Sequence, residues 1–232
     1  MALLRWYSAN TAGPQFGVGT APSVGAFDGA NLWISNTTDG TVTKLRANDG
    51  ATLGTFSVGT QPGAIAFDGA NVWVANGGSS NITELRASDG TTLGTFSIPA
   101  SFPSAIAFDG ANIWVGDGAH NAVVKLSPSN GSVLGTFSVN ANPVAIAFDG
   151  SNLWVTSDEP GGSVVKLRVS DGASQGSFSV GSYAVGVAFD GANVWMANSG
   201  SNTVSEIRAS DGVTLGSFPA GYERRFPVVL LS

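Results

Sequence analysis

Hydrophobic and polar positions along this chain fall into short runs that recur in a fixed order. One stretch of the chain contains four such runs, each of strand length, and they cover residues 63–67, 71–75, 82–86 and 93–98. Asp-Gly dipeptides separate the first run from the second and the third from the fourth. Gly and Asp tolerate the positive φ of tight turns, so each stretch predicts a meander of four antiparallel strands.

The side-chain pattern distinguishes the inner strands of this meander from its outer strand. In the second run, Trp73 points to one side while Val72 and Val74 point to the other, so this strand is apolar on both faces and must be covered on both. In the fourth run, the apolar side chains of Phe96 and Ile98 alternate with polar ones. Such alternation is typical of a strand nearer solvent.

The same pattern occurs five times. The motif FDG(A/S)N(L/V/I)W begins at Phe27, Phe67, Phe108, Phe148 and Phe189, so successive copies lie 40 or 41 residues apart. A second motif runs in step with it, and its Asp-Gly or Asn-Gly turns begin at Asp49, Asp89, Asn130, Asp171 and Asp211. Four-stranded sheets repeated at this period, with Gly and aromatic residues in fixed places, are typical of a β-propeller.

The two ends of the chain match complementary parts of the repeat. At the N-terminus, Leu4-Arg5 and the segment from Phe16 resemble the third and fourth strands of the repeat. At the C-terminus, Phe226 to Leu231 resembles Phe102 to Ala107, which contains a first strand of the repeat. Pairing the first and last strands of a chain closes a ring without open edges. We therefore expect an all-β, six-bladed propeller whose closing blade is shared between the termini, with five or seven blades as alternatives.

In this interpretation the whole chain, residues 1–232, is one domain. The closing blade takes residues 1–21 for its third and fourth strands and residues 222–232 for its first strand. The five full repeats cover residues 22–62, 63–103, 104–143, 144–184 and 185–221.

The composition of the chain limits the classes of partner that are expected. Charged residues are only 11%, the formal net charge is -6, and there is no Cys. Nucleic acid and anionic membranes bind clustered Lys and Arg, so neither is expected as a partner. The N-terminus lacks the apolar stretch of a signal peptide, and no run is long enough to span a membrane. The compartment stays open, because a chain without Cys suits reducing and oxidising environments alike.

The repeat resembles a known family. The pattern P-x-x-I-A-F-D-G-x-N-x-W-V-A-N, followed by V-x-K-L and D-G-x-x-L-G-T-F-x-V-G, is similar to the YVTN and NHL-type propeller repeats, a group that includes streptogramin-lyase-like propellers. The resemblance covers nearly the whole chain and implies the propeller fold. For the lyase members it implies a His and acidic residues around a metal at the mouth of the ring, whereas this chain has a single His, His120.

Candidate binding residues lie in the loops that differ between repeats. The turns between first and second strands and between third and fourth strands are nearly identical, whereas the loops after the second strand, residues 36–40, 76–81, 117–121, 157–162 and 198–202, vary. Variable loops on one face of a rigid scaffold are where a site is built. The candidates are Asp117, His120, Asp158 and Glu159 in these loops, and Tyr183, Tyr222, Arg224 and Arg225 in the connections between blades.

Two repeated features have a structural interpretation. We expect the five FDG aspartates, Asp28, Asp68, Asp109, Asp149 and Asp190, to form turns rather than calcium sites. The repeated tryptophans, Trp33, Trp73, Trp114, Trp154 and Trp195, occupy the same mid-strand position of every repeat, which favours core packing over sugar stacking.

These observations lead to an expected function of low specificity. We expect a monomeric, non-catalytic binding or scaffold propeller that presents its variable loops to a protein or glycan, with no cofactor, no metal and no catalytic residues. One alternative is a lyase-like or hydrolase-like enzyme that uses His120 and a divalent cation. A further alternative is a recently amplified or engineered repeat protein without an evolved ligand.

Overall fold

The computed structural model describes residues 15–220, and these residues form twenty β-strands and no helix. The first sheet consists of β1 (Pro22–Phe27), β2 (Asn31–Asn36), β3 (Thr41–Arg46) and β4 (Thr52–Ser57). The second consists of β5 (Pro62–Phe67), β6 (Asn71–Asn76), β7 (Asn81–Arg86) and β8 (Thr92–Ser97). The third consists of β9 (Pro103–Phe108), β10 (Ile113–Asp117), β11 (Ala122–Leu126) and β12 (Val133–Ser138). The fourth consists of β13 (Pro143–Phe148), β14 (Asn152–Ser157), β15 (Ser163–Arg168) and β16 (Ser174–Ser179). The fifth consists of β17 (Ala184–Phe189), β18 (Asn193–Asn198), β19 (Thr203–Arg208) and β20 (Thr214–Pro219).

Each sheet is an antiparallel meander in chain order, as the repeat predicts. In the second sheet, Trp73 pairs with Ala66 on β5 and with Glu84 on β7. Gly69 has a φ of +101°, a conformation that favours glycine, and this allows the tight turn from β5 to β6. The first strands of the second to fourth sheets begin at a proline, one residue earlier than the sequence pattern suggests.

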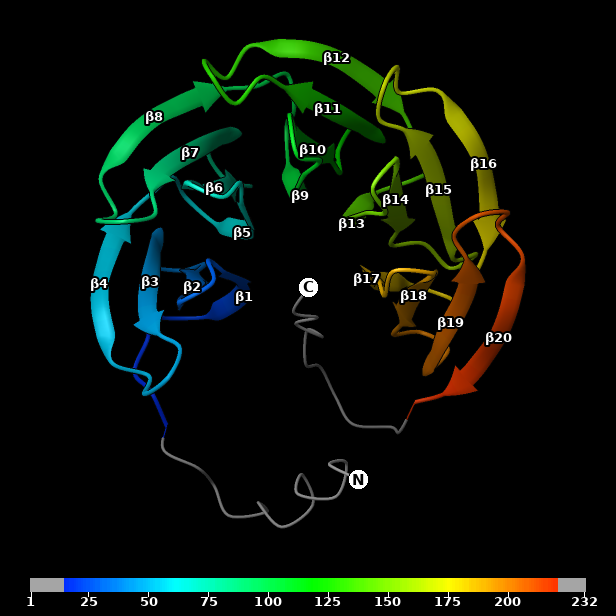
Figure 1. The fold of residues 1–232 in the computed structure, drawn as a ribbon, viewed down its shortest axis with the longest axis horizontal. Coiled ribbons are helices and arrows are strands. Elements are labelled where there is room, and N and C mark those ends of the chain that lie inside the picture. Colours follow the sequence, from blue (N-terminus) through cyan, green and yellow to red (C-terminus); the bar gives the residue numbers. More distant parts are fainter. Residues whose placement is uncertain (1–14, 221–232) are drawn as a thin grey trace.

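The five sheets stand around a common axis like blades (Figure 1). The innermost strands are β1, β5, β9, β13 and β17, and the outermost strands are β4, β8, β12, β16 and β20. Neighbouring inner strands are in contact from β1 through to β17. This arrangement confirms the all-β propeller of four-stranded blades. The described structure has five blades, so the predicted count of six is not confirmed, because most of the proposed closing blade comes from residues 1–14 and 222–232, outside the described residues.

The core lies between blades rather than inside one sheet. The tryptophan face of each blade packs against the aliphatic face of the next, as Trp33 and Val42 pack against Val72, Val74 and Leu85. Trp33, Trp73, Trp114 and Trp154 are fully buried. The interpretation of these tryptophans as core residues is therefore confirmed for the first four blades.

Two further kinds of contact bind neighbouring blades: a Phe–Gly contact at all four described interfaces and a lysine bond at three of them. The Phe56 ring lies 5.5 Å from the Trp33 ring and covers Gly90 in the following blade, where a β-carbon would collide with it. Buried Lys44 donates from Nζ to the Ala87 carbonyl of the same neighbouring blade at 2.7 Å and lies 5.0 Å from the Trp33 ring centroid. Lys125 and Lys166 make the equivalent bonds to Val169 and Ala209. The stack of blades is therefore held by both apolar and polar contacts.

Across residues 15–220 there is no helix with the length and apolar character needed to cross a membrane.

Candidate functional site

One face of the disc is made of nearly identical turns, and we call it the turn face. It contains the Asp-Gly turns between first and second strands and those between third and fourth strands. In the fourth blade, Asp149 Oδ1 accepts from the amides of Ser151 and Asn152, and Oδ2 accepts from Trp154 Nε1 at 2.8 Å. All five FDG aspartates accept the indole proton of their own tryptophan in this way. The expected role of these aspartates in turn formation is therefore what the geometry shows.

The carboxylates of the turn face bond to groups of their own blade. Burial works against ionisation of Asp149, but the hydrogen bonds from Trp154 and the turn amides outweigh it and lower the pKa of this carboxyl group. In the turns between third and fourth strands, Arg168 pairs with Asp171 at 2.6 Å, and this hydrogen bond lowers the pKa of Asp171 to about 2. The same Arg–Asp pair is present in the first, second, fourth and fifth blades, and groups that satisfy one another in this way are suited to folding rather than to ligand binding.

The opposite face, which we call the loop face, joins the loops after each second strand to the connections between blades. In the second blade, Gly77 N donates to the Gln61 carbonyl at 2.9 Å, and in the fifth, Ser199 N donates to the Tyr183 carbonyl at 2.9 Å. These bonds hold loop and connection together as one rim. The loops differ in sequence from blade to blade, so each segment of the rim presents different side chains.

Several non-glycine residues on the loop face adopt positive φ. Ser80, Asn121 and Asn202 stand at the ends of loops with φ of +52° to +53°, and Gln61 and Tyr183 stand in connections at +51° and +53°. This conformation is uncommon for residues other than Gly, Asn and Asp, and it is costly for an aromatic residue. Tyr183 is 40% exposed, so it is a strained aromatic side chain that faces solvent.

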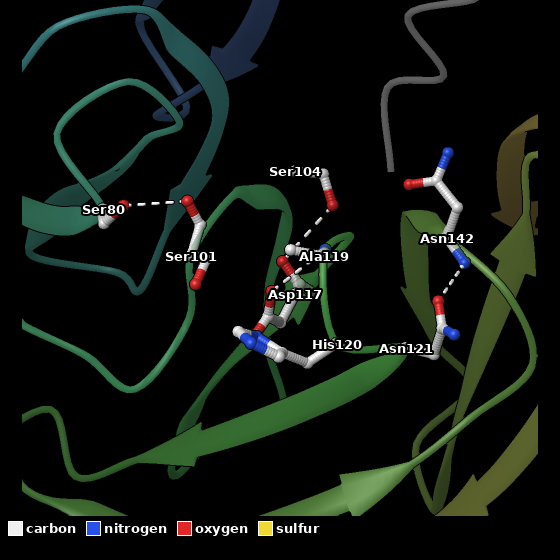
Figure 2. Close-up of polar contacts among 9 residues, drawn as sticks. Ser80, Ser101, Ser104, Asp117, Ala119, His120, Asn121 and Asn142 are labelled. Atoms are coloured by element: carbon white, nitrogen blue, oxygen red, sulfur yellow. Dashed lines mark hydrogen bonds and ion pairs between the residues drawn. The ribbon is translucent and has the colours of Figure 1, made fainter.

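Asp117 and His120 form the most distinctive pair on this face (Figure 2). His120 Nδ1 lies 2.7 Å from Asp117 Oδ2, and Asp117 Oδ1 accepts from the Ala119 amide at 3.1 Å. The Asp117 carboxylate is buried, whereas the His120 side chain is 58% exposed. The buried carboxylate therefore fixes the direction of an imidazole whose other nitrogen is free to meet a ligand.

The pair replaces a structural network that other blades retain. Asn36 stands where the third blade has Asp117, and it donates from Nδ2 to the hydroxyls of Thr41 and Thr43 at 3.0 and 2.9 Å. In the third blade the two threonine positions are Ala122 and Val124, so this internal network is lost. The Asp117 carboxylate turns to the loop and His120 instead. The loop is held beside Asn121, whose Oδ1 accepts from the Asn142 amide at 2.8 Å (Figure 2).

The other predicted residues fall into a second group or lie outside the described structure. Glu159 accepts from Ser163 Oγ through Oε1 at 2.8 Å, and its carbonyl accepts from the Tyr183 amide at 2.9 Å. The Asp158 amide donates to the Asn142 carbonyl, so this residue is also tied into the rim. The structure thus pairs Asp117 with His120 and Glu159 with Tyr183. Tyr222, Arg224 and Arg225 lie outside the described residues.

Sequence reasoning missed one exposed aromatic residue on the loop face. Phe102 lies in the connection between the second and third blades and is 49% exposed. Its ring lies beside Gly77, in the loop after the second strand of the second blade. It precedes Pro103 at the start of β9, as Tyr183 precedes Ala184 at the start of β17. This equivalence with Tyr183 is the signal in the sequence that identifies it.

An apolar cavity of about 830 Å³ opens along the inner strands of the second to fifth blades. Its lining includes Phe148, Val187, Phe189, Trp195 and Val204. Within residues 15–220, no group of three or more His, Asp or Glu side chains is arranged to hold a metal ion.

Four-stranded blades stacked around an axis, with a turn face and a loop face, define a β-propeller. The structure is similar to the hydrazine synthase of Kuenenia stuttgartiensis, with a TM-score of 0.78 and 20% identity over 92% of this chain and 69% of that chain. It is also similar to streptogramin B lyase, with a TM-score of 0.68 and 17% identity over 83% of this chain and 66% of that chain. Both likenesses concern the fold, in agreement with the resemblance of the repeats to YVTN and NHL-type propellers. No protein-family model matches the sequence, and no curated protein sequence matches it.

Proposed function

We propose that this chain is a non-catalytic binding propeller that presents its loop face to a protein or glycan. The observation that carries the proposal is the contrast between the two faces. On the turn face, the bond from the FDG aspartate to its tryptophan recurs in all five described blades, and an Arg–Asp pair recurs in four of them. On the loop face, the loops differ, and exposed aromatic and imidazole groups are held in fixed positions by buried or backbone partners.

The chemistry of the loop face suits both ligand classes. Phe102 and Tyr183 offer flat apolar rings of the kind that stack on sugars or anchor a protein contact. His120 and Glu159 supply polar groups that confer orientation. Because backbone hydrogen bonds tie the loops to the connections, binding does not have to order the loop backbone, and this part of its entropic cost is small.

A second candidate function is a lyase-like or hydrolase-like enzyme at the same face, and one observation favours it. The buried Asp117 carboxylate holds the exposed His120 ring, as a carboxylate does when it orients an imidazole for proton transfer. The likeness to streptogramin B lyase keeps this reaction class as the alternative. In this case a divalent cation would have to bind through His120 and neighbouring carboxylates or carbonyls.

We further propose that a sixth, composite blade closes the ring. The described start of the chain supports its N-terminal half, because the Phe16 ring covers Gly50 as Phe56 covers Gly90. Gly19 N donates to Asn36 Oδ1 at 2.9 Å, and Thr20 N donates to Asp39 Oδ2, which ties this segment to the loop of the first blade. Thr60 N donates to Ser79 Oγ in the same way between the first and second blades. Residues 16–20 thus occupy the place of a preceding fourth strand and its exit.

A binding screen with face-specific variants tests the function. The purified chain is applied to a glycan array and to a panel of immobilised proteins, and Kd is then measured for any ligand found. Tyr183→Ala should weaken binding at least tenfold, about 1.4 kcal/mol, while Arg208→Ala on the turn face should leave Kd unchanged. Equal losses in both variants would place the site elsewhere. Turnover of a bound ligand that stops in His120→Ala would favour the enzyme instead.

A further inference from the structure

The outer face of the fifth blade is the one tryptophan face among the described blades that no described blade covers. Trp195 is partly exposed, whereas its four equivalents are fully buried. Val185 is 46% exposed and Phe218 is 46% exposed. Trp195, Ala197 and Val204 on the same blade also line the apolar cavity of about 830 Å³.

The internal interfaces show what such a face accepts. In each of them the first strand of the next blade lies against the first and second strands of the preceding blade, as β13 lies against β9 and β10. The fourth residue of that strand packs in the core cluster of the preceding tryptophan, as Ile146 packs with Trp114. The first residue, Pro143, lies over Gly116. The face beside Trp195 therefore has the form of a socket for one apolar strand that begins with proline.

The chain leaves the fifth blade on the path that leads to this socket. Ala220 N donates to the Asn202 carbonyl at 2.8 Å, as Val58 N donates to Gly40 and Val180 N donates to Gly162 before the chain enters the next blade. Beyond Ala220 the sequence continues as GYERRFPVVLLS. Its segment from Pro227, PVVLLS, aligns with PVAIAF of β13 and places Leu230 at the position of Ile146.

We propose that residues 227–231 dock in cis on the β17–β18 face as an inner strand, with Leu230 over Trp195 and Pro227 over Ala197. This rests on the sixth blade proposed above and adds the partner residues of its closing strand and the register of that strand. It also makes residues 221–226 a connection between blades and so brings Tyr222, Arg224 and Arg225 to the loop face. The described Lys residues bond the neighbouring blade and the described Arg residues belong to the turns of the opposite face, so these two arginines would be its basic groups.

Cysteine pairing tests the docking directly, because the chain has no Cys of its own. A β-carbon added at Gly116 would lie 3.4 Å from Pro143 Cβ, close to the Cβ separation of about 3.5–4.5 Å in disulfides. The equivalent pair is Ala197→Cys with Pro227→Cys. Ala184 occupies the proline position in β17, so a residue other than proline is tolerated there.

Under mild oxidation of the full chain, the 197/227 pair should form an intramolecular disulfide, seen as a monomeric gel shift and as a linked peptide by mass spectrometry. Ala75→Cys with Pro103→Cys, at a described interface, is the positive control. Ala197→Cys with Val228→Cys is the register control. The second residue of a first strand lies toward the following blade, as the bond from Ser104 Oγ to the Pro143 carbonyl shows, so this pair should stay reduced.

Three results would overturn the proposal: no disulfide in the 197/227 pair while the positive control forms, equal disulfide formation in the register control, or disulfide-linked dimers, which would make a second copy the occupant. The crosslink is measured without ligand, so it is independent of the binding proposal. A formed crosslink with no binding to glycans or proteins would leave the docking intact and reject the proposed function.

Discussion

At the scale of single residues, the FDG aspartate does two tasks with one carboxylate. One oxygen caps the turn and the other satisfies an indole N–H that is otherwise buried in the core between blades. The repeat predicts the first task, because Asp before Gly is a turn signal at any position. It does not predict the second, because the bond to Trp154 depends on how the turn folds back over the start of the following strand. The charge of these aspartates is thus committed to the fold.

Replacing one of these aspartates should cost more than the loss of a turn residue alone. Asp149→Ala removes the acceptor of the fully buried Trp154 N–H as well as two turn bonds, and an unsatisfied buried donor costs about 1–3 kcal/mol. Urea unfolding followed by tryptophan fluorescence measures the loss. Asp171→Ala, in an exposed turn with its own arginine partner, is the control and should be clearly less destabilising. Equal losses would show that the indole bond contributes nothing.

Glu84 is the residue whose ionisation opposes the fold. Burial raises the pKa of its carboxyl group, and the nearby Asp68 carboxylate raises it further. A raised pKa in the folded state means that the folded state binds more protons, so stability falls as pH rises from the unfolded pKa of Glu through the folded pKa. Glu84→Gln should therefore raise Tm at pH 7, and the difference should shrink toward pH 4. A variant that is less stable than the parent at pH 7 would contradict this.

The candidate site shows what residue-level reading can find. Asp117 and His120 are three residues apart in one loop, so their pairing lies within reach of sequence reasoning. The direction of the Asp117 carboxylate is not. This position is buried in other blades too, as at Asn36, and the carboxylate turns to the loop because the neighbouring strand lacks the threonine hydroxyls that Asn36 binds. Phe102 was missed because Pro103 made the dipeptide look like a strand start alone.

At the scale of elements, the unit of stability is the interface between two blades. The strand pattern predicts this, since a second strand that is apolar on both faces needs a neighbour on each side. Ile98 shows a limit of that reading: its alternation with Phe96 suggested a longer strand, but β8 ends at Ser97 and Ile98 is buried in the connection. The lysines that cross the interface were not predicted, because a charged residue on a strand usually marks a solvated position.

Removing one crossing lysine should loosen a blade interface. Lys44→Met keeps the apolar stem over Trp33 but leaves the Ala87 carbonyl without its charged donor, and hydrogen bonds to charged groups are worth about 1.5–3 kcal/mol. Thermal unfolding by circular dichroism measures the change. Arg46→Met, at an exposed ion pair two residues away, is the matched control and should change Tm less. A Tm for Lys44→Met equal to that of the parent would show that the contact is not stabilising.

At the scale of the whole molecule, the sequence predicts the architecture well and the ring closure only by analogy between repeats. Five repeats in register predict five sheets of known strand order, and the structure has them. The closing blade depends on residues 1–14 and 222–232, which match the repeat in part only, and the count of six stays a prediction. The split into a turn face and a loop face follows directly from antiparallel order.

Chelator treatment separates the binding scaffold from the metal-dependent alternative. We expect EDTA to leave Tm unchanged and elemental analysis to find no stoichiometric ion, because the carboxylates of the loop face are scattered one or two to a loop. One tightly bound Ca²⁺ or Zn²⁺ per chain, with a sharp fall of Tm on chelation, would instead support the enzyme that uses His120.

Deleting residues 226–232 tests the closed ring as a whole. If this segment covers the face beside Trp195, its removal exposes that face and takes four large apolar side chains, Val228, Val229, Leu230 and Leu231, out of the core. Each is worth roughly 1.5–3 kcal/mol when buried, so the total is comparable to the roughly 5–15 kcal/mol net stability of a domain.

The truncated chain should therefore aggregate or fail to fold, as judged by size-exclusion chromatography and circular dichroism. Deleting residues 77–80 of a loop is the control, and it should be tolerated far better because shortening a surface loop removes no core. A truncation that stays soluble, monomeric and nearly as heat-stable as the parent would show that the five described blades are stable without a sixth. Tyr222, Arg224 and Arg225 would then have no defined place on the loop face.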